Sequence, residues 1–526
     1  MSRAAAGPGL GPESQTTCDV VVYGDSSGAV TAALAARRQG LSVVLVNPTG
    51  FLGGMSASGL GATDFLGQRS TFGGIAAQFY DGIAAAYGQE YVRSFEPHIG
   101  QREFDRLVAE AGLRVLCNEE LDRDGGVRLA GRRILAITTL RGRTYQGRMF
   151  IDATYVGDLM AAAGVTCTVG RESEAQYGED LAGVRRGDTE PRDHYTQGDK
   201  DHFVRDVDPY RVPGDPASGL LPLVFEIGDL ANGQGDAKIQ AYNYRLCLTT
   251  DADLRLPLEK PDGYREIDHE LLLRNLAAGD ERLPGLVEPL AGKASKVDWN
   301  SMHSVSTDLP TVNWEYPEAS YERRREIEAL YQTYTRGFLW TLSSHPRVPA
   351  AIREQASGYG LPADEFTDNG GWPYMIYIRE ARRMVSDYVM TQQDCEGSRS
   401  APDPVGLASF GMDSHVVQYY VNERGHVRRD GTIWRVPPKP YGLSYRSIVP
   451  RRGECENLLV PVCLSASHVA HGSIRMEPVF MVLGQSAATA ARVALEDGVA
   501  VQDVSYNNLR RCLLESGQRL ENEAEP

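Results

Sequence analysis

Residues 18–61 read CDVVVYGDSSGAVTAALAARRQGLSVVLVNPTGFLGGMSASGLG and decide the fold of the chain. The apolar run at 20–23 is β-branched and too short for a helix, which predicts a buried strand. Small residues at 24–29 predict a turn, and the apolar side chains at 30–37 then recur at helical spacing. A glycine closes this helix, and residues 41–46 predict a second buried strand. Together these elements form a βαβ unit, whose parallel crossover is almost always right-handed.

The turn of this unit is a candidate nucleotide site. A helix N-terminus presents free backbone N–H groups and a partial positive charge, which suit a diphosphate. The dinucleotide fingerprint Gly-x-Gly-x-x-Gly/Ala is only partly present, as Gly24, Ser26 and Ala29. Ser26 puts a side chain where backbone should approach phosphate, and Asn47 replaces the acidic residue expected at the ribose. The window predicts a mononucleotide or dinucleotide site; the alternative is a packing turn in an ordinary α/β sheet.

Length, charge and cysteine usage bound the class of protein. The 526 residues are too many for one core, which predicts two closely connected domains. The net charge of −16 argues against nucleic acid or an anionic membrane as a partner. None of the eight cysteines forms a CxxC pair, so we expect reduced thiols in a cytoplasmic protein, without a disulfide framework or a metal site. Residues 1–17 predict a disordered tail without a signal peptide, and no apolar stretch approaches membrane-spanning length.

Two further segments point to ligand binding beside the βαβ unit. Residues 51–64 are dense in glycine, which either allows close backbone approach to a flat ligand or makes a mobile loop; the position favours the first. A strand at 149–152 stops at small and acidic residues and leads into a helix at 159–163. Ligands of α/β proteins bind at the carboxyl ends of parallel strands, although a plain strand–helix turn is an equal alternative here. Between these segments we expect helices at 72–93 and 102–111 and strands at 113–116 and 134–140.

The α/β pattern stops at about residue 172. Up to residue 440, Pro, Tyr, Trp and charged residues are more frequent, and the βαβ periodicity disappears. We expect an inserted α+β substrate or cap domain, with a strand at 240–249 and charge-rich helices at 321–342 and 377–392. Its aromatic residues would suit the lid of a small-molecule pocket, although such residues are more often core.

A late strand and helix restore the pattern. Residues 457–463 predict a buried strand, and Pro478 stands at the first position of a helix that runs to about 495. Small residues in this helix would let it lie close to another helix or to a cofactor. The nucleotide-binding domain is therefore predicted to be discontinuous, with parts at 18–171 and 441–520.

These segments together resemble a family of FAD-dependent oxidoreductases sometimes described as xanthan-lyase-like. The resemblance runs from Asp19 to Leu520, with the motifs in matching order and spacing. It implies an α/β, two-domain flavoprotein fold similar to glutathione reductase, with a Rossmann-type discontinuous FAD-binding domain, an inserted cap and FAD as cofactor. The motifs that carry it include VVYG (21–24), FLGGM (51–55), GLGATD (59–64), IDATYVGDLMAAAGV (151–165), GRESEAQYGE (170–179), QAYNYRLCLT (240–249), DEFTDNGGWP (364–373), IREARRMVSDYVMTQ (378–392), GMDSH (411–415) and ECENLLVPVCLSASHVAHGSIRMEPVFMVLGQSAATAA (454–491).

The resemblance also implies which residues contact the cofactor. It places the diphosphate over the first turn, the adenosine ribose near Asn47 and the flavin pyrimidine near 475–478. Two more positions depart from the family, because Val156 stands where members commonly have Glu and His471 where they commonly have an aromatic residue. These departures indicate changed substrate chemistry. The implied cofactor-binding residues are Gly24, Ser26, Ser27, Gly28, Ala29, Asn47, Pro48, Leu52, Gly53, Gly54, Met55, Ala153, Thr154, Asp158, Arg475 and Pro478.

The candidate catalytic residues are His415, His468, His471 and Arg475. Flavin oxidation of an alcohol or amine needs a base for the O–H or N–H proton, and histidine titrates near the working pH, although any one of these histidines is more often structural. Asp413 could orient His415, since residues two apart on a strand share a face. Arg475 could stabilise the reduced flavin, bind a substrate carboxylate, or simply pair with Glu477 or another surface acid.

The leading prediction is an FAD-dependent dehydrogenase or oxidase that transfers hydride from a small polar alcohol or amine to the flavin. A flavin-bound lyase or isomerase without net redox turnover is the alternative, and a non-enzymatic nucleotide-binding scaffold is the third possibility. The expected partners are a small-molecule substrate and an electron acceptor, O2 or another, but neither nucleic acid nor a membrane.

Overall fold

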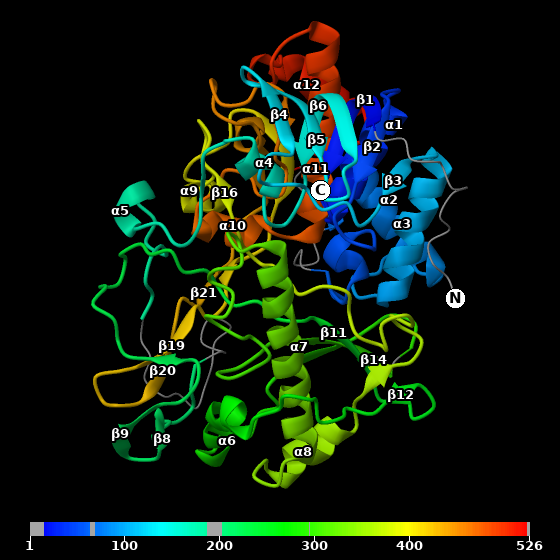
Figure 1. Cartoon of the computed structure of the whole chain (residues 1–526). Coiled ribbons are helices and arrows are strands. Elements are labelled where there is room, and N and C mark those ends of the chain that lie inside the picture. Colours follow the sequence, from blue (N-terminus) through cyan, green and yellow to red (C-terminus); the bar gives the residue numbers. More distant parts are fainter. Residues whose placement is uncertain (1–14, 64–68, 187–201, 294, 523–526) are drawn as a thin grey trace.

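A seven-stranded mixed sheet forms the upper part of the protein in Figure 1. The computed structural model describes residues 15–63, 69–186, 202–293 and 295–522. The strand order is β3-β2-β1-β6-β5-β4, and β23 pairs with β6 outside this order. All pairings are parallel except those of β5 with β6 and with β4. The strands are β1 (Gln15–Tyr23), β2 (Val43–Val46), β3 (Arg114–Leu116), β4 (Val127–Ala130), β5 (Arg133–Thr138), β6 (Thr144–Asp152) and β23 (Leu458–Leu459).

Two helices that are far apart in the sequence pack together beside this sheet. α1 (Ser27–Arg38) and α11 (Glu477–Asp497) approach so closely that a Cβ at Gly28 would lie 2.7 Å from the carbonyl oxygen of Phe480. The small residues of both helices therefore serve helix packing. This contact, together with the pairing of β23 and β6, returns the C-terminal segment to the first βαβ unit, as predicted. The other helices around the sheet are α2 (Gly74–Ala86), α3 (Pro97–Ala111), α4 (Asp158–Ala162), α10 (His468–Ile474) and α12 (Tyr506–Glu515).

α11 corrects one sequence prediction. By length and composition alone this helix could cross a membrane, so the statement that no apolar stretch approaches that length is wrong. However, 89% of its most apolar window is buried inside the protein. A helix that is apolar on nearly all sides is expected in the core of a large protein as well as in a bilayer.

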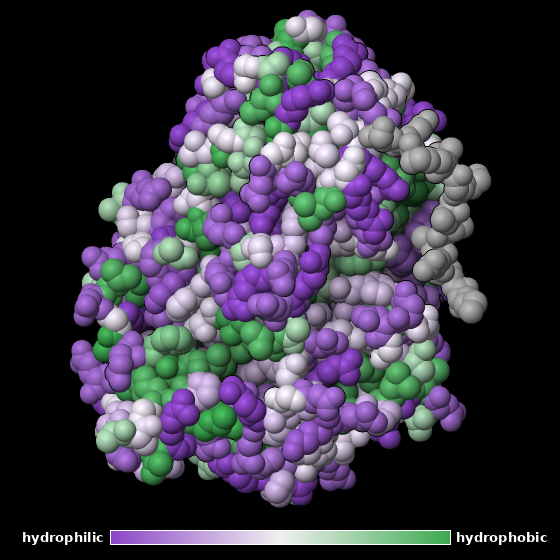
Figure 2. All heavy atoms as spheres, in the orientation of Figure 1, coloured by the Kyte–Doolittle hydropathy of each residue, from purple (hydrophilic) through white to green (hydrophobic). Residues whose placement is uncertain are grey.

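In the lower part of the protein in Figure 1, short helices and small sheets surround the long helix α7 (Tyr321–Ser344). Figure 2 shows hydrophobic patches on the lower half of the same face, where the surface is otherwise mostly hydrophilic. The elements of this part and its connections are β7 (Cys167–Thr168), α5 (Glu174–Tyr177), β8 (Tyr210–Val212), β9 (Asp215–Leu220), β10 (Val224–Phe225), β11 (Leu246–Thr249), β12 (Arg255–Leu256), α6 (Glu270–Ala277), β13 (Leu286–Pro289), β14 (Lys296–Asn300), α8 (Ala350–Ser357), β15 (Leu361–Pro362), β16 (Arg383–Met384), α9 (Gln392–Glu396), β17 (Pro404–Ala408), β18 (Met412–Ser414), β19 (Gln418–Val421), β20 (Val427–Asp430), β21 (Ile433–Arg435) and β22 (Tyr441–Ser444).

The predicted helix at 377–392 is wrong. The segment is extended and contains only the short strand β16 before α9 begins. Its charges suggested a solvated helical face, but Arg379 and Arg383 are buried and pair with different carboxylates, those of Asp308 and Glu172. Because each buried cation needs its own acidic partner, tertiary contacts outweigh the local pattern.

Other boundaries differ less. The predicted strands at 240–249 and 457–463 are shorter, and the helix expected at 72–93 ends at Ala86. Residues 1–14 of the predicted tail lie outside the described residues, whereas residues 15–17 belong to β1, so the prediction of a tail up to residue 17 is wrong at that end. All eight cysteines are free thiols, which confirms that the chain has no disulfide framework.

Candidate functional site

The turn after β1 is locked to the end of β6. Ser26 caps α1: its Oγ accepts from the Ala29 N–H at 3.2 Å and donates to the Ala153 carbonyl at 2.7 Å. A Cβ at Gly24 would overlap the same Ala153 carbonyl. The predicted residues Gly24, Ser26, Ala29 and Ala153 therefore lie together, as expected. The Ser26 side chain turns towards β6, which leaves the N-terminus of α1 open to an acceptor.

The acceptor at this N-terminus is Glu477, the first residue of α11. Its Oε1 accepts from the Tyr155 hydroxyl at 2.7 Å and its Oε2 from the Ser56 hydroxyl at 3.4 Å. Burial raises the pKa of this carboxyl to about 7, although hydrogen bonds from the hydroxyl and the backbone N–H of Ser27 favour its charged form. The Tyr155 hydroxyl in turn accepts from the Met55 N–H at 3.0 Å. The start of α11, the start of α1 and the glycine-rich loop thus meet at one carboxyl group.

Two aspartates add negative charge beside this point. Asp25 is half-buried with one enclosed oxygen that lacks a hydrogen-bond partner, and burial raises its pKa to about 7. Burial also raises the pKa of Asp152, to about 6, while its carboxylate accepts from the N–H groups of Thr154 and Met160. The pKa values of three carboxyl groups around the turn, those of Asp25, Asp152 and Glu477, therefore lie close to neutral pH.

Asp158, a predicted cofactor contact, lies in different surroundings. Burial alone would raise its pKa, but Arg324, Arg382 and Arg123 outweigh this and lower it. Arg324 Nη1 lies 2.6 Å and Arg382 Nη1 3.0 Å from the carboxylate oxygens. The carboxylate joins the first helix turn of α4 to Arg324 of α7 and to Arg382, and its contact with a cofactor stays a prediction.

The glycine-rich loop makes close contacts within the protein. Gly53 and Gly54 have φ angles of +89° and +55°, a region that favours glycine. A Cβ at Gly53 would overlap the Phe104 ring, and one at Gly54 would overlap the Tyr155 hydroxyl. Asn47 is buried and bonds within the same loop, through Nδ2 to the Phe51 carbonyl and Oδ1 to the Thr49 N–H. These contacts within the protein are sufficient to explain why Gly53, Gly54 and Asn47 stand at these positions. Their predicted roles in cofactor binding therefore remain predictions.

A second polar cluster surrounds His415, directly after β18. Its Nδ1 lies 2.8 Å from Asp308 Oδ2 and its Nε2 lies 3.2 Å from Asp413 Oδ2. Arg379 pairs with Asp308 at 2.9 Å, and Arg475 pairs with Asp413 at 2.8 Å. The expected pairing of Asp413 with His415 is confirmed, and Arg475 pairs with Asp413 rather than Glu477. The cluster is a chain of paired acidic and basic side chains that ends two residues before α11.

The other two candidate histidines lie in α10 and are fully enclosed. His468 Nδ1 lies 2.8 Å from Glu380, and burial lowers its pKa to about 3. Burial also lowers the pKa of His471 well below its ordinary value, and its Nδ1 has no hydrogen-bond partner. Both rings are therefore neutral over the usual working range. His415 keeps 14% of its side chain exposed, which makes it the most accessible of the three.

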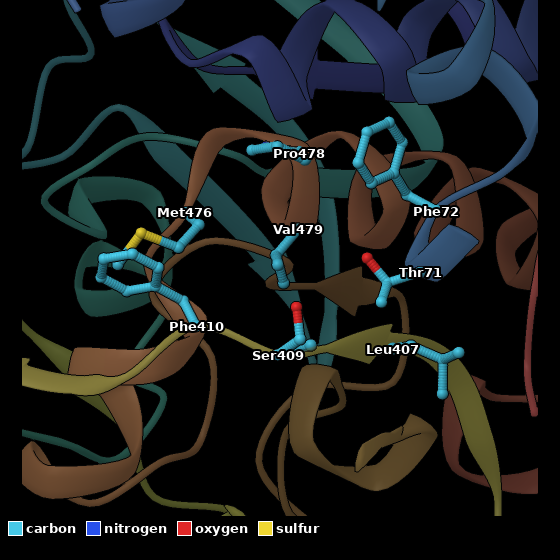
Figure 3. A pocket seen from close by; sticks show the side chains of 9 residues that line it. Thr71, Phe72, Leu407, Ser409, Phe410, Met476, Pro478 and Val479 are labelled. Carbon is cyan, nitrogen blue, oxygen red and sulfur yellow. The ribbon is translucent and has the colours of Figure 1, made fainter. Parts of the chain in front are cut away.

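A small cavity lies at the start of α11. Its volume of about 10 Å³ has room for about one water molecule and is far below the ~300–1,000 Å³ of common ligand pockets. Figure 3 shows side chains from three parts of the chain around it, among them the predicted Pro478 and its neighbour Met476. The remaining lining residues are Thr71, Phe72, Leu407, Ala408, Ser409, Phe410 and Val479. Arg475 of the His415 cluster directly precedes Met476 of this lining in the sequence.

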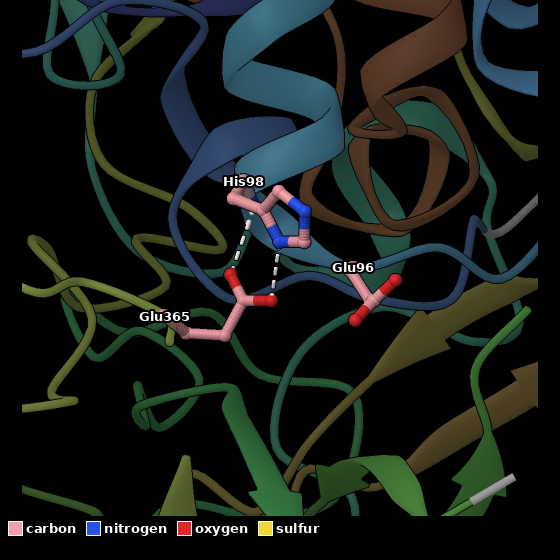
Figure 4. Close-up of side chains that lie close together, drawn as sticks. All are labelled: Glu96, His98 and Glu365. Atoms are coloured by element: carbon pink, nitrogen blue, oxygen red, sulfur yellow. Dashed lines mark hydrogen bonds and ion pairs between the residues drawn. The ribbon is translucent and has the colours of Figure 1, made fainter. Parts of the chain in front are cut away.

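A third cluster joins Glu96, His98 and Glu365 (Figure 4). His98 Nδ1 lies 2.6 Å from Glu365, and the geometry would allow three ligands to a metal ion. However, the buried Lys296 ammonium lies 2.7 Å from Glu96 and 2.8 Å from Glu365. The lysine supplies the positive charge that a cation would bring, so this cluster is an ion-pair network. Nothing in the sequence pattern predicted it, because its members come from three separate segments.

A mostly parallel sheet, with the N-terminus of its first helix at the carboxyl edge of the strands, is typical of nucleotide-binding α/β proteins. The chain belongs to the FAD dependent oxidoreductase family, which it matches over residues 19–513. A comparison with curated proteins gave no significant match. The family membership confirms the predicted oxidoreductase class and FAD as the cofactor.

Solved structures of flavoproteins are similar over a limited part of the chain. A flavin monooxygenase mutant from Stenotrophomonas maltophilia is 19% identical over 26% of this chain and 37% of its own, with a TM-score of 0.18. A flavoprotein/dehydrogenase from Cytophaga hutchinsonii is 15% identical over 28% of this chain and 42% of its own, with a TM-score of 0.22. A thioredoxin reductase from Streptococcus pyogenes is 17% identical over 26% of this chain and 35% of its own, with a TM-score of 0.18. The chain thus spans less than half of each of these proteins.

The residues at the start of α1 fit the diphosphate of FAD in their chemistry. The backbone N–H of Ser27 and the hydroxyls of Ser56 and Tyr155 form a donor set that already holds the Glu477 carboxyl. The neighbouring Gly54 has no room for a side chain, which keeps the backbone close to these donors. Sequence reasoning missed Tyr155 and the role of Glu477, since neither belongs to the dinucleotide fingerprint.

Proposed function

We propose that this oxidoreductase dehydrogenates a small polar substrate of the alcohol or amine type. Bound FAD supplies the hydride acceptor. The protein must then orient the substrate and remove the O–H or N–H proton. The observation that carries the proposal is the chain of paired side chains Arg379–Asp308–His415–Asp413–Arg475, which ends one residue before Met476 of the cavity lining.

His415 and Asp413 would act as one proton-accepting unit. The His415 ring is fixed from both sides, because each nitrogen faces a carboxylate oxygen. Burial would raise the pKa of Asp308, but Arg379 and His415 outweigh this and hold it well below the ordinary value, so Asp308 stays charged and supports a positive ring. Asp413 is 18% exposed and His415 14%, which leaves both within reach of a substrate.

Arg475 and Tyr377 would bind the polar group of the substrate. Arg475 Nη1 donates to the Tyr377 hydroxyl at 2.8 Å, and Arg475 Nη2 donates to the Asp413 carboxylate. The guanidinium plane thus fixes a phenol and a carboxylate at its two ends. Such a fixed pair of polar groups orients a substrate at low entropic cost.

The test is anaerobic flavin reduction with a panel of small alcohols and amines. His415→Ala should keep bound FAD and reduce it about 10²–10⁴-fold more slowly, because a general base contributes about that factor. The loss should become smaller at high pH, where a deprotonated substrate no longer needs the base.

The matched control is His426→Ala, which removes another aspartate-paired histidine, 3.3 Å from Asp206. This variant should reduce its flavin at the parent rate. If His415→Ala does so as well with a true substrate, the proton goes elsewhere and the proposal fails.

A further inference from the structure

Glu477 and the FAD diphosphate draw on the same donors. The Ser27 N–H and the hydroxyls of Ser56 and Tyr155 are groups at the N-terminus of α1 that can bind an anion, and the Glu477 carboxyl lies on them. The carboxyl group also stands at the first position of α11, so two helix N-termini converge on it. We propose that Glu477 is a built-in competitor of the cofactor diphosphate, and that FAD binds with uptake of one proton by this carboxylate.

The surroundings leave the carboxyl group little space in which to move. Glu477 is 2% exposed. On one side Gly28 lies against the Phe480 backbone, and on the other Gly54 lies against Tyr155, with no room for a Cβ at either glycine. A group enclosed in this way stays close to the diphosphate when FAD is bound. Its charge must then change for the shared donors to turn from the carboxyl to the phosphates.

The local charges favour a neutral carboxyl beside a diphosphate. Among the described residues, the hydrogen bonds and ion pairs of the Glu477 side chain include no cation. The titratable groups that face this region are Tyr155 from the end of β6, Asp25 from the turn, and Asp152 and Asp158 further along β6 and α4. Of these, only Asp158 is neutralised by arginines. An ionised Glu477 beside two phosphate charges would therefore be strongly unfavourable.

The direction of the pH dependence follows from this arrangement. Burial raises the pKa of Glu477 to about 7, so the group is mostly neutral below pH 7 and mostly ionised above it. If FAD binds the neutral form, each binding event above pH 7 takes a proton from solvent onto a carboxylate oxygen. The apparent dissociation constant of FAD should then rise up to about tenfold for each pH unit above 7. The proposal rests on FAD as the cofactor and is independent of the substrate.

The experiment is equilibrium binding of FAD to the full-length chain between pH 6 and 9, followed by flavin fluorescence. Glu477→Gln keeps the size of the side chain and removes its titration. We expect this variant to bind FAD about tenfold more tightly than the parent at pH 8, and to lose the pH slope. Glu328→Gln is the matched control, since Glu328 is another carboxyl with a raised pKa that accepts from a tyrosine hydroxyl, that of Tyr316 at 2.6 Å. It should behave like the parent.

Two outcomes would overturn the inference. Weaker FAD binding in Glu477→Gln at all pH values would make Glu477 a ligand of the cofactor rather than a competitor. An unchanged slope in Glu477→Gln, with the slope lost in Asp25→Asn, would assign the proton to Asp25.

A measurement on the parent protein needs no variant. Calorimetric titration of FAD in buffers with different ionisation enthalpies should show uptake of about 0.9 proton per FAD at pH 8, as expected for one group of pKa about 7. Absence of uptake would exclude the proposal even if the variants fail to fold. No substrate is added, so this result does not test the proposed dehydrogenation. Conversely, a parent rate of flavin reduction in His415→Ala would not contradict the proton uptake on FAD binding.

Discussion

Glu477 and Asp158 occupy equivalent places and behave in opposite ways. Each is the first residue of a helix near the carboxyl edge of the sheet, and each is at most 3% exposed. Asp158 meets three arginines, which lower its pKa, whereas Glu477 meets hydroxyl and N–H donors, and burial raises its pKa to about 7. Neutral donors do not compensate the desolvation of a buried charge as cations do. Asp158 is therefore suited to hold parts of the protein together, and Glu477 is suited to change its charge.

Removal of Asp158 should have the largest effect on stability. Asp158→Ala leaves the buried Arg324 and Arg382 without the carboxylate that they share, and breaking a buried pair costs about 3–5 kcal/mol. We expect a loss of that size in the free energy of unfolding by urea at pH 7. Glu477→Gln, measured at pH 5, where the Glu477 carboxyl is mostly neutral, should cost less than about 1 kcal/mol because it exchanges one neutral hydrogen-bonding group for another. Equal losses in the two variants would remove the distinction between the sites.

The pH dependence of stability should separate the same two residues. The folded pKa of Glu477 lies above its unfolded value of about 4.3, so the folded chain binds the proton more tightly and stability falls as pH rises towards 7. Between pH 5 and pH 8, Glu477→Gln should therefore gain about 3 kcal/mol relative to the parent. Asp158 has a lowered pKa, so its contribution is present above pH 4 and is lost only in acid.

Asp158→Asn is the control for this pH series. Its difference in unfolding free energy from the parent should stay constant between pH 5 and pH 8, because Asp158 is ionised in both the folded and the unfolded chain over that range. A constant difference for Glu477→Gln over the same range would contradict the raised pKa.

The sequence predicted what depends on local pattern. The βαβ unit at 18–61 was recognisable because its strands are short apolar runs and its turn is made of small residues. The late return to the sheet was recognisable from the apolar strand and Pro478. FAD followed from motif order along most of the chain, as the family match over residues 19–513 confirms.

The same reasoning could not predict contacts between distant segments. The charges at 377–392 suggested a helix because their partners, such as Asp308, lie far away in the sequence. Glu477 was weighed only as a partner of Arg475, since its nearness to Tyr155 exists only after α11 packs on α1. A buried acid near neutrality is a property of the folded environment, and no single-residue pattern signals it.

The smallest expected effect concerns Ser56, which donates to Glu477 over a long 3.4 Å. Ser56→Ala removes one donor to the charged form of the carboxyl group, so the pKa of Glu477 should rise further and FAD binding should weaken only at a higher pH. Since a typical hydrogen bond contributes about 1 kcal/mol and this one is long, we expect the midpoint of the binding profile to move upward by less than about one pH unit. Ser58→Ala is the matched control, because Ser58 is a buried serine of the same loop whose hydroxyl accepts from the Tyr374 N–H at 2.8 Å instead. It should lower stability without moving the midpoint, and a downward shift in Ser56→Ala would mean that the hydroxyl does not stabilise the charged carboxylate.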